Sequence, residues 1–291
     1  MDLSSAGNSY QYTDLLLGMQ FWELFHEACA STRLGINYNH PMRDIIYGRN
    51  AVYETLRSKR RQFFTLQVAE SAKPTGRIND ILQLAASQRL PVTRVPRLKL
   101  GPQDVNHQGV ALEASSYPYV DLADILERAQ QAGELPFLLI LDALQDPQNF
   151  GGLLRTAESA GVHGILIPLA RTAEVTPAVV NASAGATEHL FIAPTNLSQA
   201  MDALKKEDVW MVGLDPHGET LDHQSDRHLR GALALVVGSE GEGLRELTRK
   251  KCDVLLQLPM RGRIGSLNTA IAGSIALYLA YLARKMGAGL E

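Results

Sequence analysis

Residues 137–168 read FLLILDALQDPQNFGGLLRTAESAGVHGILIP. An uninterrupted apolar run at 137–141 is followed by a polar loop, a helical pattern and a second apolar run at 164–168. Apolar runs of this kind are typical of strands that are buried on both faces. A strand, a helix and a second strand in this order form the repeating unit of a parallel sheet covered by helices.

The same alternation continues almost to the end of the chain. Further apolar runs lie at 189–193, 209–214, 232–238 and 253–258, with helical patterns between most of them. We therefore predict an α/β domain with a parallel sheet over residues 136–286. Ligands of open parallel sheets bind beyond the carboxyl ends of the strands, so the segments that follow these runs are where we expect a site.

A smaller module is predicted over residues 44–115. Its apolar periodicity indicates a strand or turn, a helix, a strand, a second helix and a further strand, which together make a small α/β fold. Residues 41–115 carry 12 lysines and arginines against 6 acidic residues, whereas residues 116–291 carry 15 against 21. The whole chain has a net charge of −3, so a basic module is joined to an acidic domain. Such a concentrated basic region indicates a surface for nucleic acid.

Several cations lie along and just after the first helix of this module. We predict RNA contacts for Arg49, Arg57, Lys59, Arg60 and Arg61. The alternative interpretation is a solvated helix end, because basic residues there suit the helix dipole. Contact with phosphates and a solvated face both remain open at this point.

The remaining segments restrict the class of protein. Residues 116–135 are predicted to be a linker with one polar helix, and residues 1–43 an extension of unknown role. Cys29 and Cys252 are too few for a disulfide scaffold and too far apart for a metal-ligand cluster. The most apolar stretch, 269–283, is shorter than a membrane span. We expect a folded cytoplasmic protein without a metal or a membrane segment.

Two of the segments that follow strands carry candidate site residues. Asn149 lies in the loop after the first apolar run, and Arg155 lies one turn into the helix, where its side chain can lean back over that loop. The alternative is a capping asparagine with a surface arginine. Glu240 lies within VVGSEGEGL (236–244), a glycine-rich turn that matches neither a dinucleotide fingerprint nor a P-loop.

The third segment is LPMRGRIGSLNTAIAG, residues 258–273. Ser266 or Asn268 can cap the final helix and leave its first N–H groups available to an acceptor. A capped core helix is the alternative, but it does not explain the basic loop that comes before the cap.

Together, DPQNFGGLLRTA (146–157), VVGSEGEGL and LPMRGRIGSLNTAIAGSIAL (258–277) resemble the three motifs of the SpoU/TrmH branch of the SPOUT methyltransferases. Upstream, YGRNAVYETLRS (47–58) and NHQGVAL (106–112) resemble the substrate-binding domain of the ribosomal RNA guanosine 2′-O-methyltransferases of that branch. The resemblance spans residues 45–285, nearly the whole chain.

This resemblance implies an enzyme that uses S-adenosylmethionine to methylate a ribose 2′-hydroxyl, with guanosine in large-subunit (23S-type) ribosomal RNA as the expected target. It also implies a deep trefoil knot and a homodimer. The implied catalytic residues are Asn149, Arg155, Glu240, Ser266 and Asn268. The implied cofactor-binding residues are Gly238, Leu258 and Leu267. A transfer RNA methyltransferase and a non-catalytic knotted RNA-binding or ribosome-assembly factor are the alternatives.

Overall fold

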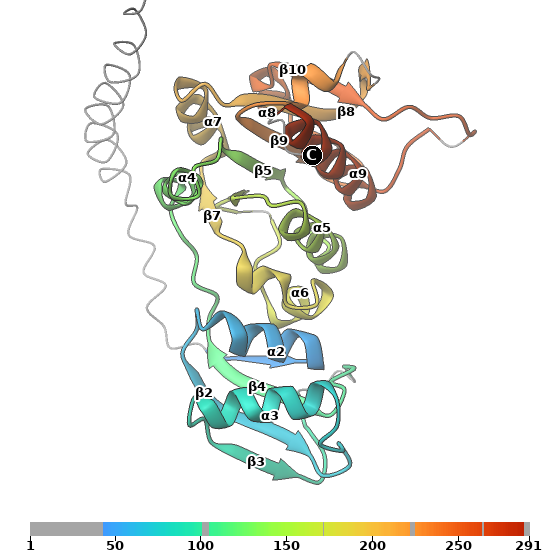
Figure 1. Cartoon of the computed structure of the whole chain (residues 1–291). Coiled ribbons are helices and arrows are strands. Elements are labelled where there is room, and N and C mark those ends of the chain that lie inside the picture. The colour runs from blue at the N-terminus through green and yellow to red at the C-terminus, as the bar shows by residue number, and fades with distance from the viewer. Residues whose placement is uncertain (1–42, 101–104, 171, 222–224, 264, 288–291) are drawn as a thin grey trace, which may run out of the picture. The chain divides into compact units, whose positions relative to one another are not determined.

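The computed structural model describes most of the chain after residue 42 (Figure 1). The described ranges are 43–100, 105–170, 172–221, 225–263 and 265–287. They contain one four-stranded sheet and one six-stranded sheet. The predicted extension lies, apart from Arg43, outside the described residues.

The smaller sheet belongs to the N-terminal module, residues 43–115. Its elements are β1 (Arg43–Tyr47), α2 (Arg49–Ser58), β2 (Phe63–Ala69), α3 (Arg77–Ser87), β3 (Val92–Val95) and β4 (Val110–Ser115). The strand order is β1-β4-β2-β3, and β4 pairs antiparallel with both of its neighbours. Val52 and Leu56 of α2 and Ile78 and Ile81 of α3 are buried, and the two helices pack against each other. The predicted strands and helices of this module are therefore confirmed.

One helix, α4 (Leu122–Gln131), lies between the module and the larger sheet, where the sequence predicts a single polar helix. Asp121 and Asp124 form a capping box at its start, because each side chain accepts a hydrogen bond from the other residue's backbone N–H. Ile125 and Ala129 are buried on one side of the helix. The helix is thus fixed at its start and packed along one face.

The larger sheet is wholly parallel, which confirms the predicted fold class. Its strands are β5 (Phe137–Asp142), β6 (Gly164–Pro168), β7 (Ile192–Thr195), β8 (Trp210–Thr220), β9 (Leu233–Gly238) and β10 (Val254–Gln257). The order is β10-β8-β9-β5-β6-β7, with every neighbouring pair parallel. Every residue of β5, β6 and β9 is buried, as the uninterrupted apolar runs predict.

Helices pack along this sheet. They are α5 (Pro147–Ser159), α6 (Pro177–Ala182), α7 (Leu197–Lys206), α8 (Glu246–Lys251) and α9 (Thr269–Gly287), with short 3₁₀ turns η1 (Ala186–His189) and η2 (Ser225–Leu229). α5 packs against α6 and α9, whereas α7 packs against β6, β8 and α8. Figure 1 shows α5 and α9 side by side, which places the first and third motif segments together.

Two predicted strand boundaries are wrong. The apolar run 209–214 predicts a strand that ends at Leu214, but β8 continues to Thr220. The apolar run 189–193 predicts a strand, but η1 occupies residues 186–189 and β7 begins only at Ile192. Gly185 has a φ of 89°, a left-handed conformation that suits glycine and turns the chain before η1. The trefoil knot stays a prediction, because strand order alone does not establish the threading of the chain. Within the described ranges, every helix is too short or too polar to cross a membrane.

Candidate active site

A cavity of about 490 Å³ lies at the carboxyl ends of β9 and β10, beside residues 214–216 of β8. Its walls are this part of β8, the loop after β9 and the loop between β10 and α9, and ligands of parallel sheets bind at this edge. Six of the predicted site residues line it: Gly238, Glu240, Leu258, Ser266, Leu267 and Asn268. The volume and the mixture of polar and apolar walls fit an organic ligand of cofactor size. Among the described residues, no cluster of histidine, cysteine and acidic side chains could hold a metal ion.

The loop after β9 depends on glycine. Ser239 N–H donates to the Gly243 carbonyl at 3.0 Å, and Gly243 N–H donates back to the Ser239 carbonyl at 3.2 Å. A Cβ at Gly238 would lie 2.2 Å from the Gly243 carbonyl carbon, so the two segments approach at a distance that only glycine permits. The turn holds the exposed Glu240 at its tip beside the cavity.

Asp142, the last residue of β5, fixes the far end of this loop. Its buried carboxylate accepts hydrogen bonds from the Arg245 backbone N–H at 2.9 Å and from Arg245 Nε. Asp142 was not among the site residues expected from the sequence. It directly follows the apolar run 137–141, at the edge of the sheet where ligands bind, and this position could have identified it from the sequence.

Two asparagines and a glutamate connect all three motif segments. Asn149 Nδ2 donates to Glu240 Oε1, and Asn268 Nδ2 donates to Asn149 Oδ1 at 3.1 Å. Asn268 Oδ1 also accepts from the Ala270 and Ile271 N–H groups, at 2.9 and 3.2 Å. Asn268 is therefore the cap of α9, one of the two caps that the sequence allowed.

The cap of α5 is Asp146 and not Asn149. Asp146 Oδ2 accepts from the Asn149 N–H at 3.0 Å, which leaves the Asn149 side chain free to bond Glu240 and Asn268. The alternative in which Asn149 is only a cap is therefore wrong. Ser266 lies on the cavity wall and does not cap the helix.

Arg155 stands apart from this hydrogen-bonded chain. It is exposed on α5, on the helix face that carries Gln148 and Gly152. Those two residues line a shallow groove together with Asn149, Asn268, Ile271 and Ser274. Within the described ranges, the Arg155 guanidinium has no hydrogen-bond or ion-pair partner, so the expected reach toward the Asn149 loop is not made. An open cation next to this groove is available to an anionic substrate.

The structure separates the predicted RNA contacts into two groups. Arg49, Arg57 and Lys59 are exposed, and their predicted contact with RNA stays a prediction. Arg61 is buried, and its guanidinium already bonds two carboxylates. The prediction that Arg61 contacts RNA is therefore wrong. Arg60 is half-buried, and its guanidinium donates to three backbone carbonyls. Both guanidinium groups have structural partners in place of phosphates.

Comparisons with known protein families match both parts of the chain. The model described as the SpoU rRNA Methylase family matches residues 136–278. The model described as RNA 2′-O ribose methyltransferase substrate binding matches residues 45–120. A putative TrmH family tRNA/rRNA methyltransferase of Bacillus subtilis, YacO, is 40% identical over 83% of this chain and 96% of its own length. A relative with the same family name from Staphylococcus haemolyticus is 38% identical over 82% of this chain and 96% of its own length.

Solved structures share the fold at lower identity. The SpoU methyltransferase AviRb from Streptomyces viridochromogenes, in complex with AdoMet, aligns with a TM-score of 0.64 and 22% identity over 82% of this chain and 89% of its own. An AdoMet-bound rRNA methyltransferase from Sinorhizobium meliloti aligns with a TM-score of 0.63 and 23% identity over 82% of this chain and 86% of its own. Both the module and the larger domain thus occur together in known structures.

Proposed function

This chain belongs to the SpoU/TrmH family of RNA methyltransferases, and on that premise we propose that it methylates a guanosine ribose of large-subunit ribosomal RNA. RNA 2′-O-methylation is the activity of the family. One observation carries the proposal for this chain. Glu240, Asn149 and Asn268 form a hydrogen-bonded chain that joins the three motif segments beside the cavity.

We propose that S-adenosylmethionine is the methyl donor. The cavity fits it, because a volume of about 490 Å³ with both polar and apolar walls suits a ligand of this size. Gly238 at the end of β9, and Leu258 and Leu267 in the loop between β10 and α9, contribute wall positions, and their main-chain groups would hold the donor. When bound, this cofactor supplies a methyl group on a positively charged sulfur.

The side chains next to the cavity would align and deprotonate the ribose hydroxyl. Methyl transfer is an in-line displacement, so the oxygen has to be held in line with the methyl group and its proton has to be accepted. An arginine stays protonated in proteins and is a poor proton acceptor, so we assign Arg155 to the phosphate and to the developing charge on oxygen. Asn149, Ser266 or a water molecule would relay the proton, and Glu240 would hold Asn149 in place.

The exposed cations of the N-terminal module favour RNA as the substrate that reaches this site. Arg49, Arg57 and Lys59 are open to solvent along and just after α2. The module also matches the family description for substrate binding, and it carries most of the excess positive charge of the chain. We therefore propose that it binds the RNA backbone while the C-terminal domain, residues 136–286, performs the transfer.

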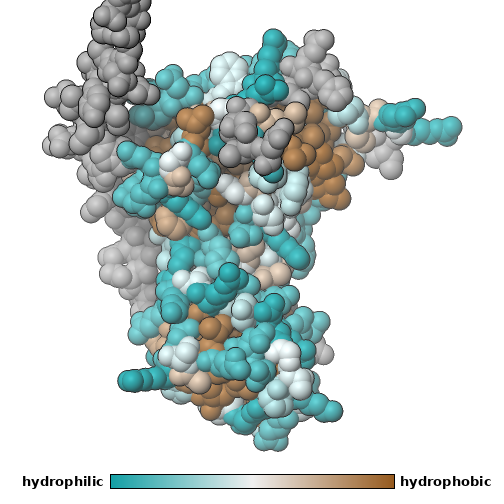
Figure 2. Space-filling view, in the orientation of Figure 1, coloured by the Kyte–Doolittle hydropathy of each residue, from teal (hydrophilic) through white to brown (hydrophobic). Residues whose placement is uncertain are grey.

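A homodimer is the proposed assembly. Figure 2 shows hydrophobic side chains gathered over α9. Four exposed apolar residues at helical spacing form this face: Ile271, Ile275, Tyr278 and Leu282. An exposed apolar stripe on a helix is typical of a subunit interface. It begins at Ile271, which also lines the groove beside Asn149, so a partner subunit would lie next to the site.

Incubation with methyl-labelled donor tests the proposal. Large-subunit ribosomal RNA, small-subunit ribosomal RNA and transfer RNA are offered separately, and the labelled nucleotide is mapped. We expect label at the 2′-oxygen of a guanosine in the large-subunit RNA. Label in transfer RNA would make transfer RNA the substrate in place of large-subunit ribosomal RNA. Protein that binds the donor and the RNA but labels none of the three would instead be a non-catalytic RNA-binding factor.

A further inference from the structure

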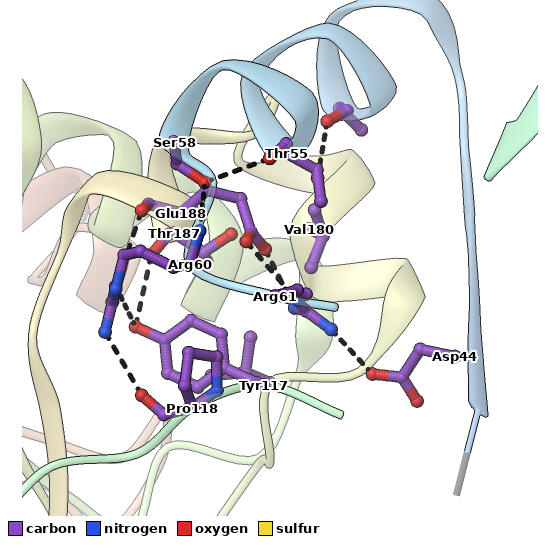
Figure 3. A network of polar contacts seen from close by, with 12 residues as sticks. Asp44, Thr55, Ser58, Arg60, Arg61, Tyr117, Pro118, Val180, Thr187 and Glu188 are labelled. Atoms are coloured by element: carbon purple, nitrogen blue, oxygen red, sulfur yellow. Dashed lines mark hydrogen bonds and ion pairs between the residues drawn. The ribbon is translucent and has the colours of Figure 1, made fainter. Parts of the chain in front are cut away.

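The buried contact between the N-terminal module and the C-terminal domain is built around Arg61. Arg61 lies in the loop between α2 and β2, and its side chain and that of Glu188 in η1 are both fully buried. Nε and Nη2 donate to the two carboxylate oxygens of Glu188, at 3.0 and 2.8 Å. Nη1 donates to Asp44 at 2.8 Å (Figure 3) and to the Ser115 carbonyl at 2.9 Å. All three nitrogens of the guanidinium thus have defined partners.

Arg60 and Tyr117 extend this contact along the chain. Arg60 Nη2 donates to the Pro118 carbonyl at 3.1 Å, and Nη1 donates to the Leu190 carbonyl. Tyr117 donates its hydroxyl hydrogen to the same Leu190 carbonyl at 2.7 Å. Burial raises the pKa of Tyr117 to about 12, so its hydroxyl keeps the proton that this bond needs. The Arg60 guanidinium also lies over the rings of Tyr117 and Phe191. We call Arg60, Arg61, Tyr117, Glu188 and Leu190 the interdomain contact.

Further close approaches surround the interdomain contact. His189 Nε2 lies 2.8 Å from Glu54 Oε2, and Asn181 Nδ2 donates to the Tyr47 carbonyl at 2.9 Å. A Cβ at Gly185 would lie 2.6 Å from Glu54 Cβ, so the backbone just before η1 lies closely against α2. Side chains and backbone of the N-terminal module therefore pack against those of the C-terminal domain as closely as within a single domain.

A buried ion pair of this kind specifies an arrangement more than it adds stability. The cost of removing both charges from water offsets much of their attraction, whereas removal of one partner leaves an uncompensated buried charge. Burial alone would lower the pKa of Arg61, but the carboxylates of Glu188 and Asp44 outweigh burial and raise it. The two parallel hydrogen bonds to Glu188 also fix the angle at which the module meets the domain.

The interdomain contact is packed directly against the helix that carries the candidate catalytic residues. η1 and α6 both pack on α5, which holds Asn149 and Arg155. A Cβ at Gly151 of α5 would lie 2.9 Å from the Ser183 backbone nitrogen, so this packing leaves no space between the two segments. Contiguous close-packed backbone therefore connects the interdomain contact to the helix that carries Asn149 and Arg155.

We propose that Arg60, Arg61 and Glu188 are positioning residues that hold the RNA-binding module at one angle to the methyl-transfer site, and so determine which ribose of the bound RNA is methylated. This inference rests on the proposed function. RNA held by the module reaches the donor cavity at a fixed separation from its point of contact. A looser contact would let neighbouring riboses reach the same site, and each would be poorly aligned.

Glu188→Gln and Arg60→Gln test the proposal in the full chain. Glu188→Gln keeps the volume but removes the charge that faces Arg61, and Arg60→Gln removes the bonds to the Pro118 and Leu190 carbonyls. We expect kcat/KM for ribosomal RNA to fall about tenfold or more, because small misplacements of a reacting group carry large rate penalties. Part of the methyl label should appear on riboses next to the target. Affinity for S-adenosylhomocysteine, the spent donor, should change by less than about twofold, because the cavity is not touched.

Arg89→Gln is the matched control. Arg89 is an exposed arginine of the same module, and within the described ranges its side chain has no partner. This variant should methylate the wild-type ribose at the wild-type rate. Folded Glu188→Gln and Arg60→Gln proteins that also keep the target and kcat/KM would overturn the proposal. A purely stabilising contact would change the melting temperature without moving the label.

Two further measurements keep the test decisive. If Glu188→Gln does not fold, Arg61→Met with Glu188→Met replaces the buried pair by apolar side chains, and an unchanged target in that folded double variant overturns the proposal.

Hydrogen exchange measures how firmly the interdomain contact is held, and it does not depend on enzymatic activity. Amides of residues 186–190 should exchange faster in Arg60→Gln than in wild type, and equal rates would contradict the proposal. A wild-type protein that methylates no RNA would instead reject the proposed function.

Discussion

The donor cavity and the interdomain contact use charged side chains in opposite ways. Beside the cavity, Glu240 is exposed at the tip of its loop, and the exposed Arg155 lacks a side-chain partner among the residues that the structure describes. At the interdomain contact, Arg61 and Glu188 are fully buried and bonded to each other. Arg155, which we propose meets the substrate, remains accessible, whereas the buried pair of Arg61 and Glu188 is already satisfied. Basic character in the sequence does not distinguish these roles, but burial does.

Arg155→Ala should have the largest effect, because it removes the unpartnered cation beside the groove. We expect kcat to fall by about 10²–10³-fold, the usual loss when a group that stabilises developing oxygen charge is removed. Affinity for S-adenosylhomocysteine should stay at the wild-type value. Steady-state methylation and calorimetry on the same preparation measure both quantities. Full turnover in Arg155→Ala would show that Arg155 takes no part in the reaction. The contrast between an accessible Arg155 and a buried Arg61 would then not reflect a difference in function.

Gly238→Ala should abolish most donor binding. The new Cβ would overlap the Gly243 backbone, so the loop that carries Glu240 has to move. We expect affinity for S-adenosylhomocysteine to fall about a hundredfold, because the backbone of a tight turn cannot move aside for a new Cβ as a flexible side chain can. Gly152→Ala is the control, since a Cβ at Gly152 meets no atom within 4 Å. Equal donor affinities in the two variants would contradict the role assigned to the glycine turn.

Asp142→Asn should weaken the donor site more moderately. The buried carboxylate holds both the backbone and the side chain of Arg245, and the amide can replace only part of that bonding. We expect about a tenfold loss of donor affinity, the size associated with a single charged hydrogen bond. Asp202→Asn is a matched control, because Asp202 forms a surface pair with Lys251 and surface pairs contribute little. Identical binding by both variants would show that Asp142 does not support the loop.

Arg57→Gln and Lys59→Gln should have the smallest effects, and both concern RNA alone. Each is expected to weaken RNA binding a few-fold and to lower the slope of log affinity against log salt by about one for each phosphate that the variant no longer binds. Donor affinity should not respond. Filter binding over a range of salt concentrations gives the slope. A slope equal to that of wild type would make these two residues an ordinary solvated surface.

The sequence predicts the fold well because its signals are local. Uninterrupted apolar runs identified the buried strands β5, β6 and β9, since a strand buried on both faces has no room for polar residues. The run at 189–193 failed because Gly185 starts a turn that apolar content does not reveal. Asn149, Glu240 and Asn268 could be singled out because each lies in a distinctive motif.

Long-range pairing could not be predicted in this way. Arg61 and Glu188 are 127 residues apart, and Asp142 and Arg245 are 103 apart, so no local pattern links either pair. Arg57, Lys59, Arg60 and Arg61 look alike in the sequence, yet only the tertiary packing buries Arg61. The sequence therefore located the basic cluster but assigned two of its members to the wrong surface.

A calorimetric titration of S-adenosylhomocysteine into the full chain tests the central claim most directly. The claim is that the loops after β9 and β10, together with residues 214–216 of β8, form a binding site for the methyl donor. Titrations at two temperatures guard against a binding enthalpy that happens to be zero at one of them. We predict saturable binding that Gly238→Ala removes and Arg155→Ala retains. Folded wild-type protein that shows no heat of association at either temperature would contradict the account.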